Sequence, residues 1–468
     1  AEWCKSLILP IVYDDQDQVE YFRNTYTEGL RKLKANVSLE TPQERMRAHK
    51  GVAAATSFYL QYQGCNDLPL QKESGELLVS IMAANFPQWS EKPDMPPPVS
   101  NGKIRVGYAS ACLREHNGAL WLLGWLRNRN KHDFEVYCYH TGPEIDSKTR
   151  EFRDLSDMFH HIPRDLTAAC NQIAADKLHI LVYPELGMDA QTLLMAGMRL
   201  APVQCVGWGH PITSGLPTMD YWISSDLMEP DNGQEHYTEK LIRLPNIGNY
   251  YSREQHDRLQ KETSTRSRAY FGLNDKAVLY FCSQSLFKYL PKHDYLFPEI
   301  ATRVPNAQFV FLAISSVHVV RRFMQRIDQA FKQYNLEAKD YCVMLNRLST
   351  EDYLALNKVT DIFLDNPSWS GNNTTLAALD CYLPVVTCPT MYMRGRHSYG
   401  ILKMAGLSEL IANNEREFID IAVNLGLNKA WYDRIVGQIR DRGELLYEDT
   451  SCVQALEEFY KEAVASQS

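Results

Sequence analysis

The chain has 468 residues, of which 45% are hydrophobic and 11% aromatic, and its formal net charge is −8 at pH 7. A chain of this length is too long for one ordinary hydrophobic core and predicts two or three globular domains. The acidic balance argues against a nucleic-acid partner. No apolar run reaches the roughly 18 residues that a membrane helix needs, so we expect no membrane partner either.

The cysteines indicate a reducing environment. There are eleven of them, an odd number, and no two form a CxxC pair. Neither a disulfide framework nor a zinc site is therefore indicated, and we predict a cytoplasmic protein.

Residues 1–90 are predicted to be helical. Apolar side chains recur every three or four residues from Val19 to Leu33, which is the pattern of one helix face. Residues 41–44, Thr-Pro-Gln-Glu, form a capping box that opens a second helix toward Tyr62. A third helix is expected from Leu70 to Ala84. The region is either a helical cap on the next domain or the end of a helical-repeat array, although no period of about 34 residues is found.

Residues 91–102 are predicted to form an extended linker. They contain Pro93 and the triplet 96–98, and proline is excluded from helix interiors. We therefore place a domain boundary here.

Two lobes of alternating strands and helices are predicted next. In the first lobe, residues 103–250, we expect strands at 104–108, 134–139, 180–183, 204–207 and 221–223. In the second lobe, residues 251–468 with closing C-terminal helices, we expect them at 278–282, 308–313, 341–345, 361–364 and 385–388. Such alternation predicts an α/β fold of two Rossmann-like lobes with parallel sheets. Ligands bind beyond the carboxyl ends of such strands, so the cleft between the lobes is the expected active site.

Common nucleotide and metal motifs are missing from both lobes. The string closest to GxGxxG is Gly207–Gly209, which lacks the third glycine, and GxxxxGK[ST] is absent. The only DxD pair, Asp15 and Asp17, precedes the first predicted helix, so no metal site is expected.

The strongest indication of function is the stretch PSWSGNNTTLAALDCYLP, residues 367–384. A loop rich in Gly, Asn and Ser leads directly into an amphipathic helix. A helix start presents unpaired N–H groups and the positive end of its dipole, which suits the diphosphate of a sugar nucleotide. The donor-binding candidates here are Gly371, Asn372, Asn373, Thr374 and Thr375. The alternative is that Asn372 or Asn373 caps a core helix that binds nothing.

Cationic side chains follow two other predicted strands. Lys288, with Gln284 before it, comes shortly after strand 278–282, where an ammonium can reach a phosphate. Arg394, Arg396 and His397 gather positive charge after strand 385–388 and also suit a diphosphate. The alternative in both places is a solvated surface charge.

Six strings follow one another along the chain: KIRVGYAS at 103 with His116 after it, HILV at 179, LAPVQ at 200, GHPITSGLPTMDYWI at 209, FKYLP at 287, and the GNNTT helix. As an ordered set they resemble the catalytic region of O-GlcNAc transferase and SPINDLY-like proteins, and we interpret the chain as a bacterial-type member. The resemblance covers about residues 100–460 and is specific as a set. It implies a GT-B fold, and inverting, metal-independent transfer of a sugar from a nucleotide donor to a protein hydroxyl, with no further cofactor.

The resemblance also implies roles for individual residues. Lys288 corresponds to the family's diphosphate-binding lysine and Thr374 to a threonine that contacts the phosphates. His116 corresponds to a histidine near the sugar and acceptor, where a neutral imidazole suits proton transfer; helix capping is the alternative. We therefore take Lys288 and His116 as catalytic candidates. The candidates for sugar or acceptor contact are His179, His210, Thr213 and Ser214, although His179 also fits a buried structural histidine.

The chain departs from the family pattern near the predicted donor site. Counting back from Pro384, Ala377 stands where the family has an acidic residue that hydrogen-bonds the ribose, and Asp380 lies one turn further on. Tyr382 stands where glycine is usual. We predict a UDP-GlcNAc or UDP-glucose type of donor and a Ser/Thr acceptor. The alternatives are a catalytically degenerate relative that binds or regulates a partner, and a GDP-fucose-dependent protein O-fucosyltransferase; a homo- or hetero-oligomer stays open.

Overall fold

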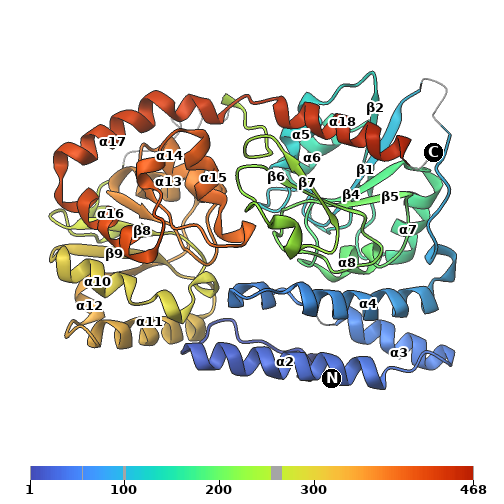
Figure 1. The fold of residues 1–468 in the computed structure, drawn as a ribbon, viewed down its shortest axis with the longest axis horizontal. Helices are drawn as coiled ribbons and strands as arrows, with labels where there is room; N and C mark the ends of the chain where they lie inside the picture. Colours follow the sequence, from blue (N-terminus) through green and yellow to red (C-terminus); the bar gives the residue numbers. More distant parts are fainter. Residues whose placement is uncertain (1, 55, 98–101, 254–265, 467–468) are drawn as a thin grey trace.

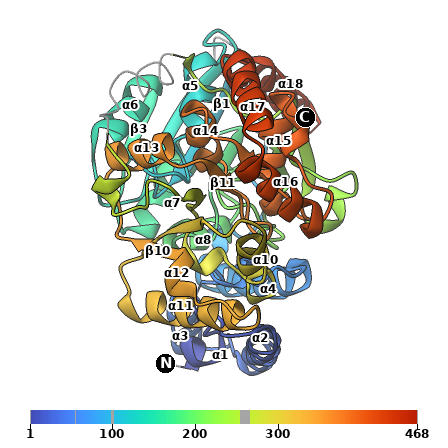
Figure 2. The same ribbon diagram turned by 90° about the vertical axis from the view of Figure 1, so that its left-hand side faces the viewer.

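The structure, a computed structural model, describes residues 2–54, 56–97, 102–253 and 266–466. Two parallel β-sheets, each covered by helices on both faces, lie side by side (Figure 1). A helical N-terminal region runs along one side of both lobes in each of two perpendicular views (Figures 1 and 2). Among the described residues, no helix combines the length and the hydropathy that crossing a membrane requires.

The N-terminal region contains the helices α1 (Glu2–Ser6), α2 (Gln16–Asn36), α3 (Pro42–Ala53) and α4 (Leu68–Asn85). The predicted capping box is confirmed, since Glu44 N–H donates to Thr41 Oγ1 and Thr41 N–H to Glu44 Oε2. The predicted extension to Tyr62 is wrong. The chain leaves α3 at Ala53 and forms a short 3₁₀ helix, η1 (Leu60–Gln63), in which the Tyr62 ring packs against Phe287 and Trp369 of the second lobe.

The DxD pair of Asp15 and Asp17 lies at the start of α2 and not in either lobe. The Asp15 carboxylate accepts from Gln18 N–H at 2.7 Å, which makes Asp15 the N-cap of the helix. No group of three or more His, Cys, Asp or Glu side chains suited to a metal ion occurs in the described ranges. Metal independence itself stays a prediction.

The first lobe has a seven-stranded parallel sheet in the order β3-β2-β1-β4-β5-β6-β7. Its elements are β1 (Ile104–Ser110), α5 (Leu122–Asn128), β2 (Phe134–His140), α6 (Ser147–Leu155), β3 (Met158–His161), α7 (Leu166–Ala175), β4 (Ile180–Tyr183), α8 (Ala190–Ala196), β5 (Val203–Val206), β6 (Tyr221–Ser225) and β7 (Lys240–Leu244). The five predicted strands are confirmed, whereas β3 and β7 were not predicted. Both are edge strands, which need less apolar surface than strands covered by neighbours on either side.

The second lobe has a five-stranded parallel sheet in the order β10-β9-β8-β11-β12. Its elements are β8 (Val278–Cys282), α10 (Leu296–Arg303), β9 (Ala307–Leu312), α11 (Val317–Lys332), α12 (Ala338–Tyr341), β10 (Cys342–Leu345), α13 (Thr350–Val359), β11 (Ile362–Leu364), α14 (Asn373–Asp380), β12 (Val385–Val386), α15 (His397–Met404), α16 (Glu415–Leu427) and α17 (Lys429–Arg442). All five predicted strands are found. The prediction of an α/β fold with two Rossmann-like lobes is therefore confirmed.

The C-terminal helix α18 (Ser451–Ala465) returns to the first lobe (Figure 1). The Tyr460 hydroxyl lies 3.2 Å from that of Tyr108 in β1, and the Phe459 ring packs against Tyr221 of β6 at 4.9 Å. The segment 251–468, predicted as the second lobe, thus gives its last helix to the first sheet. This crossing ties the two lobes together at the side opposite the helical region.

α14 ends in a left-handed turn. Tyr382 has a φ of 58°, and Leu383 N–H donates to Ala378 O at 2.9 Å. Glycine adopts this conformation freely, whereas an L-residue with a side chain loses about 1 kcal/mol. The resemblance leads one to expect glycine at this position, and glycine would adopt the left-handed conformation without strain. Tyr382 adopts the same conformation at this energetic cost.

The helical region is bonded to both lobes. Gln61 Nε2 lies 2.7 Å from His210 Nε2 in the first lobe, and Arg326 of the second lobe donates to Tyr13 O at 2.8 Å. Arg326 also forms a buried ion pair with Asp294 at 2.6 Å. Because the same region contacts both lobes, it sets their spacing on this side of the cleft.

Candidate active site

The site lies where the loops that follow β1, β8 and β11 meet. β1 and β8 are the central strands at which the strand order reverses, so their carboxyl ends open onto a crevice. The side chain of Asn373, the first residue of α14, donates to Asn117 Oδ1 in the loop after β1 at 3.1 Å. The start of α14 therefore faces the first lobe across the crevice.

Lys288 is joined to the start of α14 through one side chain. Its Nζ donates to Gln284 Oε1 at 2.9 Å, and Gln284 Nε2 donates to Thr374 Oγ1 at 2.8 Å. The ammonium also lies 5.8 Å from the centre of the Trp369 ring. Because burial withdraws the ammonium from water, the pKa of Lys288 falls to about 8. The lysine is still charged at pH 7, and a poorly hydrated charge attracts a phosphate strongly.

Asp365, directly after β11, shapes the loop before α14. Its buried carboxylate accepts from Gly371 N–H at 2.8 Å, from Ser370 Oγ at 2.6 Å and from Thr387 Oγ1 at 2.7 Å. A Cβ on Gly371 would lie 2.1 Å from Thr374 Oγ1 and 2.6 Å from Gln284 Nε2, so any larger residue would displace the side chains that join Lys288 to α14. Asp365 is not among the residues predicted from the sequence, although an acidic residue between an apolar strand and a Ser/Gly loop was a usable signal.

The starts of α14 and α15 are held side by side by hydroxyl groups. Thr375 Oγ1 donates to Gly371 O at 2.8 Å and lies 2.7 Å from Ser398 Oγ, while Ser398 N–H donates to Ser370 Oγ at 2.8 Å. Each helix start presents N–H groups and a positive dipole end. Together with Lys288 they form a positively polarised corner suited to a diphosphate. His397, the first residue of α15, lies beside it; Ser398 was not predicted.

His116 lies in the loop after β1, as predicted. Its Nδ1 accepts a hydrogen bond from Gly118 N–H at 3.1 Å. Burial lowers the pKa of His116, and the nearby Arg114 guanidinium adds to this effect. The ring is therefore neutral at pH 7, and with Nδ1 acting as an acceptor its proton resides on Nε2.

The residues that depart from the expected family pattern make contacts within the protein or offer no side-chain acceptor. The Asn372 side chain does not cap α14 but donates to the Tyr251 hydroxyl at 3.2 Å. α14 begins at Asn373, so Ala377 lies in its second turn and offers no side-chain acceptor. Asp380, at the last turn, accepts from the Tyr447 hydroxyl. Asp380 is thus already engaged and does not replace an acidic side chain at position 377.

His179 is not brought to the site. It precedes β4 at the amino edge of the first sheet, and its Nδ1 accepts from Arg105 N–H at 2.9 Å. Burial lowers the pKa of His179 to about 4. Since ligands bind at the opposite, carboxyl edge, the structure corrects the substrate assignment in favour of a satisfied structural histidine.

His210 faces the helical region. Its Nε2 lies 2.7 Å from Gln61 Nε2, and its ring stacks on Phe58 with a centroid distance of 5.4 Å. Burial lowers the pKa of His210 to about 3. The neutral ring therefore accepts from Gln61 and serves as part of the joint between this lobe and η1, not as a substrate contact.

The hydroxyls of Thr213 and Ser214 are also engaged. Thr213 Oγ1 donates to Glu239 Oε2 at 2.6 Å, and Ser214 N–H donates to Glu239 Oε1 at 2.9 Å. Gly215 has a φ of 70°, and a Cβ there would lie 2.1 Å from Gln71 O of α4. The backbone of this loop thus lies against α4, and its hydroxyls are held by Glu239, so the loop supports contact within the protein rather than with a sugar.

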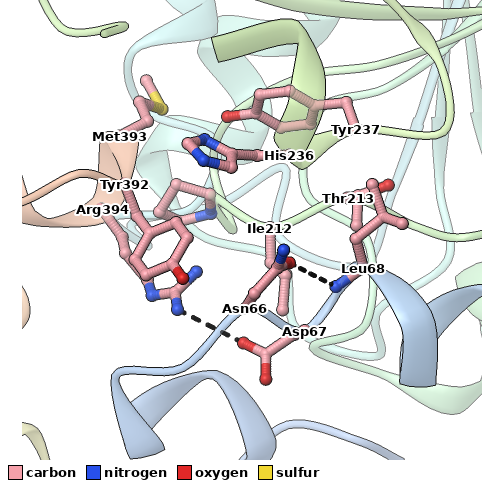
Figure 3. A pocket seen from close by; sticks show the side chains of 11 residues that line it. Asn66, Asp67, Leu68, Ile212, Thr213, His236, Tyr237, Tyr392, Met393 and Arg394 are labelled. Atoms are coloured by element: carbon pink, nitrogen blue, oxygen red, sulfur yellow. Dashed lines mark hydrogen bonds and ion pairs between the residues drawn. The ribbon is translucent and has the colours of Figure 1, made fainter. Parts of the chain in front are cut away.

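Arg394 points away from the donor site and toward the helical region. Figure 3 shows its guanidinium in a pocket where Asn66–Leu68 meets residues of both lobes. Arg394 Nη2 lies 3.4 Å from Asp67 Oδ2, and Asp67 is also paired with Arg23 at 2.7 Å. Burial raises the pKa of Asp67, which the two guanidinium groups oppose. Arg394 therefore neutralises a buried carboxylate instead of a diphosphate.

Arg396 links the lobes. Its Nε donates to Met228 O in the first lobe at 3.1 Å, and its Nη1 donates to Thr390 O at 3.2 Å. The guanidinium also stacks over the Tyr399 ring at 4.4 Å. These contacts fix the loop that leads into α15 but leave no indication of phosphate binding.

We expect Arg394→Ala to lower stability more than donor affinity. The change leaves Asp67 buried with only Arg23 as a cationic partner, so the free energy of unfolding should fall by about 3 kcal/mol. Urea denaturation measures this loss, and calorimetric titration with UDP measures affinity. Asp67→Leu combined with Arg394→Met should recover only part of the stability, because it removes these two charges but leaves Arg23 without its carboxylate partner. A large loss of UDP affinity at unchanged stability would return Arg394 to the donor site.

Comparison with known proteins identifies the family. The sequence matches the family described as glycosyl transferase family 41 over residues 80–263 and 251–448. The chain belongs to glycosyl transferase family 41. This confirms the resemblance drawn from the ordered strings. The match covers both lobes, including the loops that carry His116, Lys288 and Thr374.

Individual family 41 relatives are distant. A probable UDP-N-acetylglucosamine–peptide N-acetylglucosaminyltransferase, SPINDLY of Arabidopsis thaliana, is 25% identical over 343 residues, which is 72% of this chain and 36% of the relative. SEC of the same plant, named likewise, is 24% identical over 379 residues, 77% of this chain and 37% of the relative. The chain thus spans about a third of the length of these relatives.

Among solved structures, a mutant O-GlcNAc transferase of Thermobaculum terrenum is similar in fold. The TM-score is 0.73 at 23% identity, over 97% of this chain and 85% of that one. The similarity supports the GT-B arrangement of the two lobes predicted from the sequence.

Proposed function

We propose that this family 41 chain transfers a sugar from a UDP-sugar, of the UDP-GlcNAc or UDP-glucose type, to a serine or threonine hydroxyl of a protein or peptide. The proposal includes inversion at the anomeric carbon and no metal ion. The observation that carries it is the Lys288–Gln284–Thr374 hydrogen-bonded chain at the start of α14, facing the first lobe. The names of the SPINDLY and SEC relatives support this choice of donor and acceptor.

In the proposed reaction the acceptor oxygen attacks the anomeric carbon from the face opposite the diphosphate. The bond from that carbon to the phosphate oxygen breaks, UDP leaves, and the configuration inverts. Negative charge grows on the departing oxygen, and Lys288 and the N–H groups at the starts of α14 and α15 stabilise it. In metal-dependent enzymes a divalent cation stabilises such charge on a leaving phosphate. In the proposed reaction the lysine and the helix N–H groups do so instead.

The acceptor hydroxyl loses its proton in this step. His116 is the candidate base, but its neutral ring carries the proton on Nε2 while Nδ1 accepts from Gly118 N–H. His116 therefore acts as a base only after the Gly118 hydrogen bond opens or the tautomer changes. This role stays a prediction, as do the cytoplasmic location and any oligomer.

A second candidate is a non-catalytic relative that binds a partner or regulates it. Ala377 favours it, since no acidic side chain lies at that turn of α14 and Asp380 is held by Tyr447. Losing a ribose acceptor costs about 1 to 3 kcal/mol if its partner stays buried. GDP-fucose is the alternative donor.

Two measurements test the proposal. Thermal unfolding with UDP-GlcNAc, UDP-glucose and GDP-fucose should show stabilisation by a UDP-sugar, about 2.7 kcal/mol at 100 times the dissociation constant. Incubation with radiolabelled UDP-GlcNAc and a Ser/Thr peptide array should release UDP and label peptide in the presence of EDTA. Stabilisation without UDP release indicates the non-catalytic relative, and a response to GDP-fucose alone indicates the other donor.

A further inference from the structure

His397 carries a buried polar atom whose role the proposed function does not yet explain. It is the first residue of α15, and its side chain is 6% exposed. Within the part of the chain that the structure describes, no group hydrogen-bonds to its buried Nε2. An unsatisfied buried acceptor or donor costs about 1 to 3 kcal/mol, so such an atom calls for a partner.

The ring lies between the diphosphate corner and the first lobe. Lys288 is close enough to influence its titration, and the Trp208 ring, which follows β5, packs edge-on at 5.9 Å. The next residue, Ser398, is bonded to Thr375 at the start of α14 at 2.7 Å. A diphosphate bound at Lys288 and Thr374 would therefore present its sugar substituent on the side of His397 and Trp208.

The protonation of the ring decides which group it can bind. The backbone of Ser370 favours a proton on the ring, and Nε2 has no hydrogen-bond partner, so we assign the single proton of the neutral ring to Nδ1. Burial, together with the neighbouring Lys288, lowers the pKa of His397 to about 4. At pH 7 the ring is therefore neutral, with a lone pair on Nε2.

This corrects the cationic role that the sequence predicted for His397. A lone pair repels a phosphate oxygen, which is itself only an acceptor, and attracts an O–H group. The hydroxyls nearest to a bound diphosphate on the first-lobe side belong to the sugar that is transferred. The acceptor hydroxyl is the competing source, and it is absent from a complex of donor and enzyme alone.

We propose that Nε2 of His397 accepts a hydrogen bond from a hydroxyl of the donor sugar and thereby selects a sugar that carries it. The inference rests on the proposed function. It assigns sugar recognition to the second lobe, at the start of α15, whereas Lys288 and Thr374 hold the diphosphate. His397 therefore acts on sugar choice and not on nucleotide affinity.

Calorimetric titration of the whole chain with UDP and with UDP-GlcNAc tests the assignment. His397→Leu should weaken UDP-GlcNAc about tenfold and UDP less than about twofold. His397→Gln keeps an acceptor at this position and should restore most of the affinity for UDP-GlcNAc. Lys403→Ala, an exposed position on the same helix, is the matched control and should change neither value.

Deoxy analogues identify the hydroxyl. For one of the 3-, 4- and 6-deoxy forms of UDP-GlcNAc, wild type and His397→Leu should have the same affinity, because the hydroxyl that bonds to His397 is already missing from that analogue. Equal loss for UDP and UDP-GlcNAc, or additive losses with all three analogues, would overturn the inference. Should the leucine variant not fold, His397→Met, whose thioether is only a weak acceptor, takes its place in the same comparison with wild type. If wild type bound no UDP at all, the proposed function would fail as well.

Discussion

Lys288→Ala is expected to reduce kcat/KM for transfer from UDP-GlcNAc about 10³-fold, which corresponds to about 4 kcal/mol of transition-state stabilisation. The ammonium donates to Gln284 at 2.9 Å, and Gln284 in turn bonds to Thr374 at the start of α14. Without it, the charge that grows on the departing diphosphate meets only helix N–H groups. UDP affinity, measured by calorimetry, should fall with the rate.

The control for this change is Lys292→Ala. Lys292 is exposed and four residues further along, so the variant should stay within about twofold of wild type. The pH dependence gives a second check. Because the pKa of Lys288 is lowered to about 8, UDP affinity should be full below pH 8 and fall as pH rises through that value. A flat profile, or an active alanine variant, would remove Lys288 from the diphosphate site.

Asp365→Ala is expected to lower the free energy of unfolding by about 4 kcal/mol and to abolish UDP binding. The carboxylate holds Gly371 N–H, Ser370 Oγ and Thr387 Oγ1, and all three donors would lose a buried acceptor. The loop would then no longer bring the starts of α14 and α15 together. Urea denaturation measures the first effect, and UDP titration at a temperature where the variant is folded measures the second.

Asp365→Asn separates the two consequences. It keeps an acceptor for Gly371 N–H, and the two hydroxyls can rotate to accept from the amide, so it should cost only about 1 kcal/mol. UDP binding should persist in this variant. An alanine variant as stable as wild type would show that the Asp365 hydrogen bonds are not what maintains the loop.

Much of the fold was predictable because it depends on local patterns. The apolar strand 180–183, bounded by His179 and Pro184, and the Thr41–Glu44 capping box are set by residues close in sequence. β3 and β7 escaped prediction since an edge strand carries a weaker apolar pattern. The end of α3 escaped because η1 is shaped by distant rings of the second lobe, such as Phe287 and Trp369.

The candidate site was only partly predictable. Lys288, Thr374 and His116 follow strands whose carboxyl ends meet, and the order of strand and loop was enough to find them. Arg394 and Thr213 follow strands too, yet their partners are Asp67 of the helical region and Glu239. Position after a strand thus identified candidates but did not separate ligand contacts from contacts between parts of the protein.

The sequence by itself determined the two α/β lobes, the helical region before them, and the helix start that follows β11, because period, capping and loop composition act over a few residues. Tertiary structure alone decided which polar side chains remain available to a ligand. It pairs Arg394 with Asp67, holds the Gly371 loop on Asp365, and leaves His397 neutral beside Lys288. Burial and charge at these places depend on residues up to hundreds of positions apart, and only the folded chain brings them together.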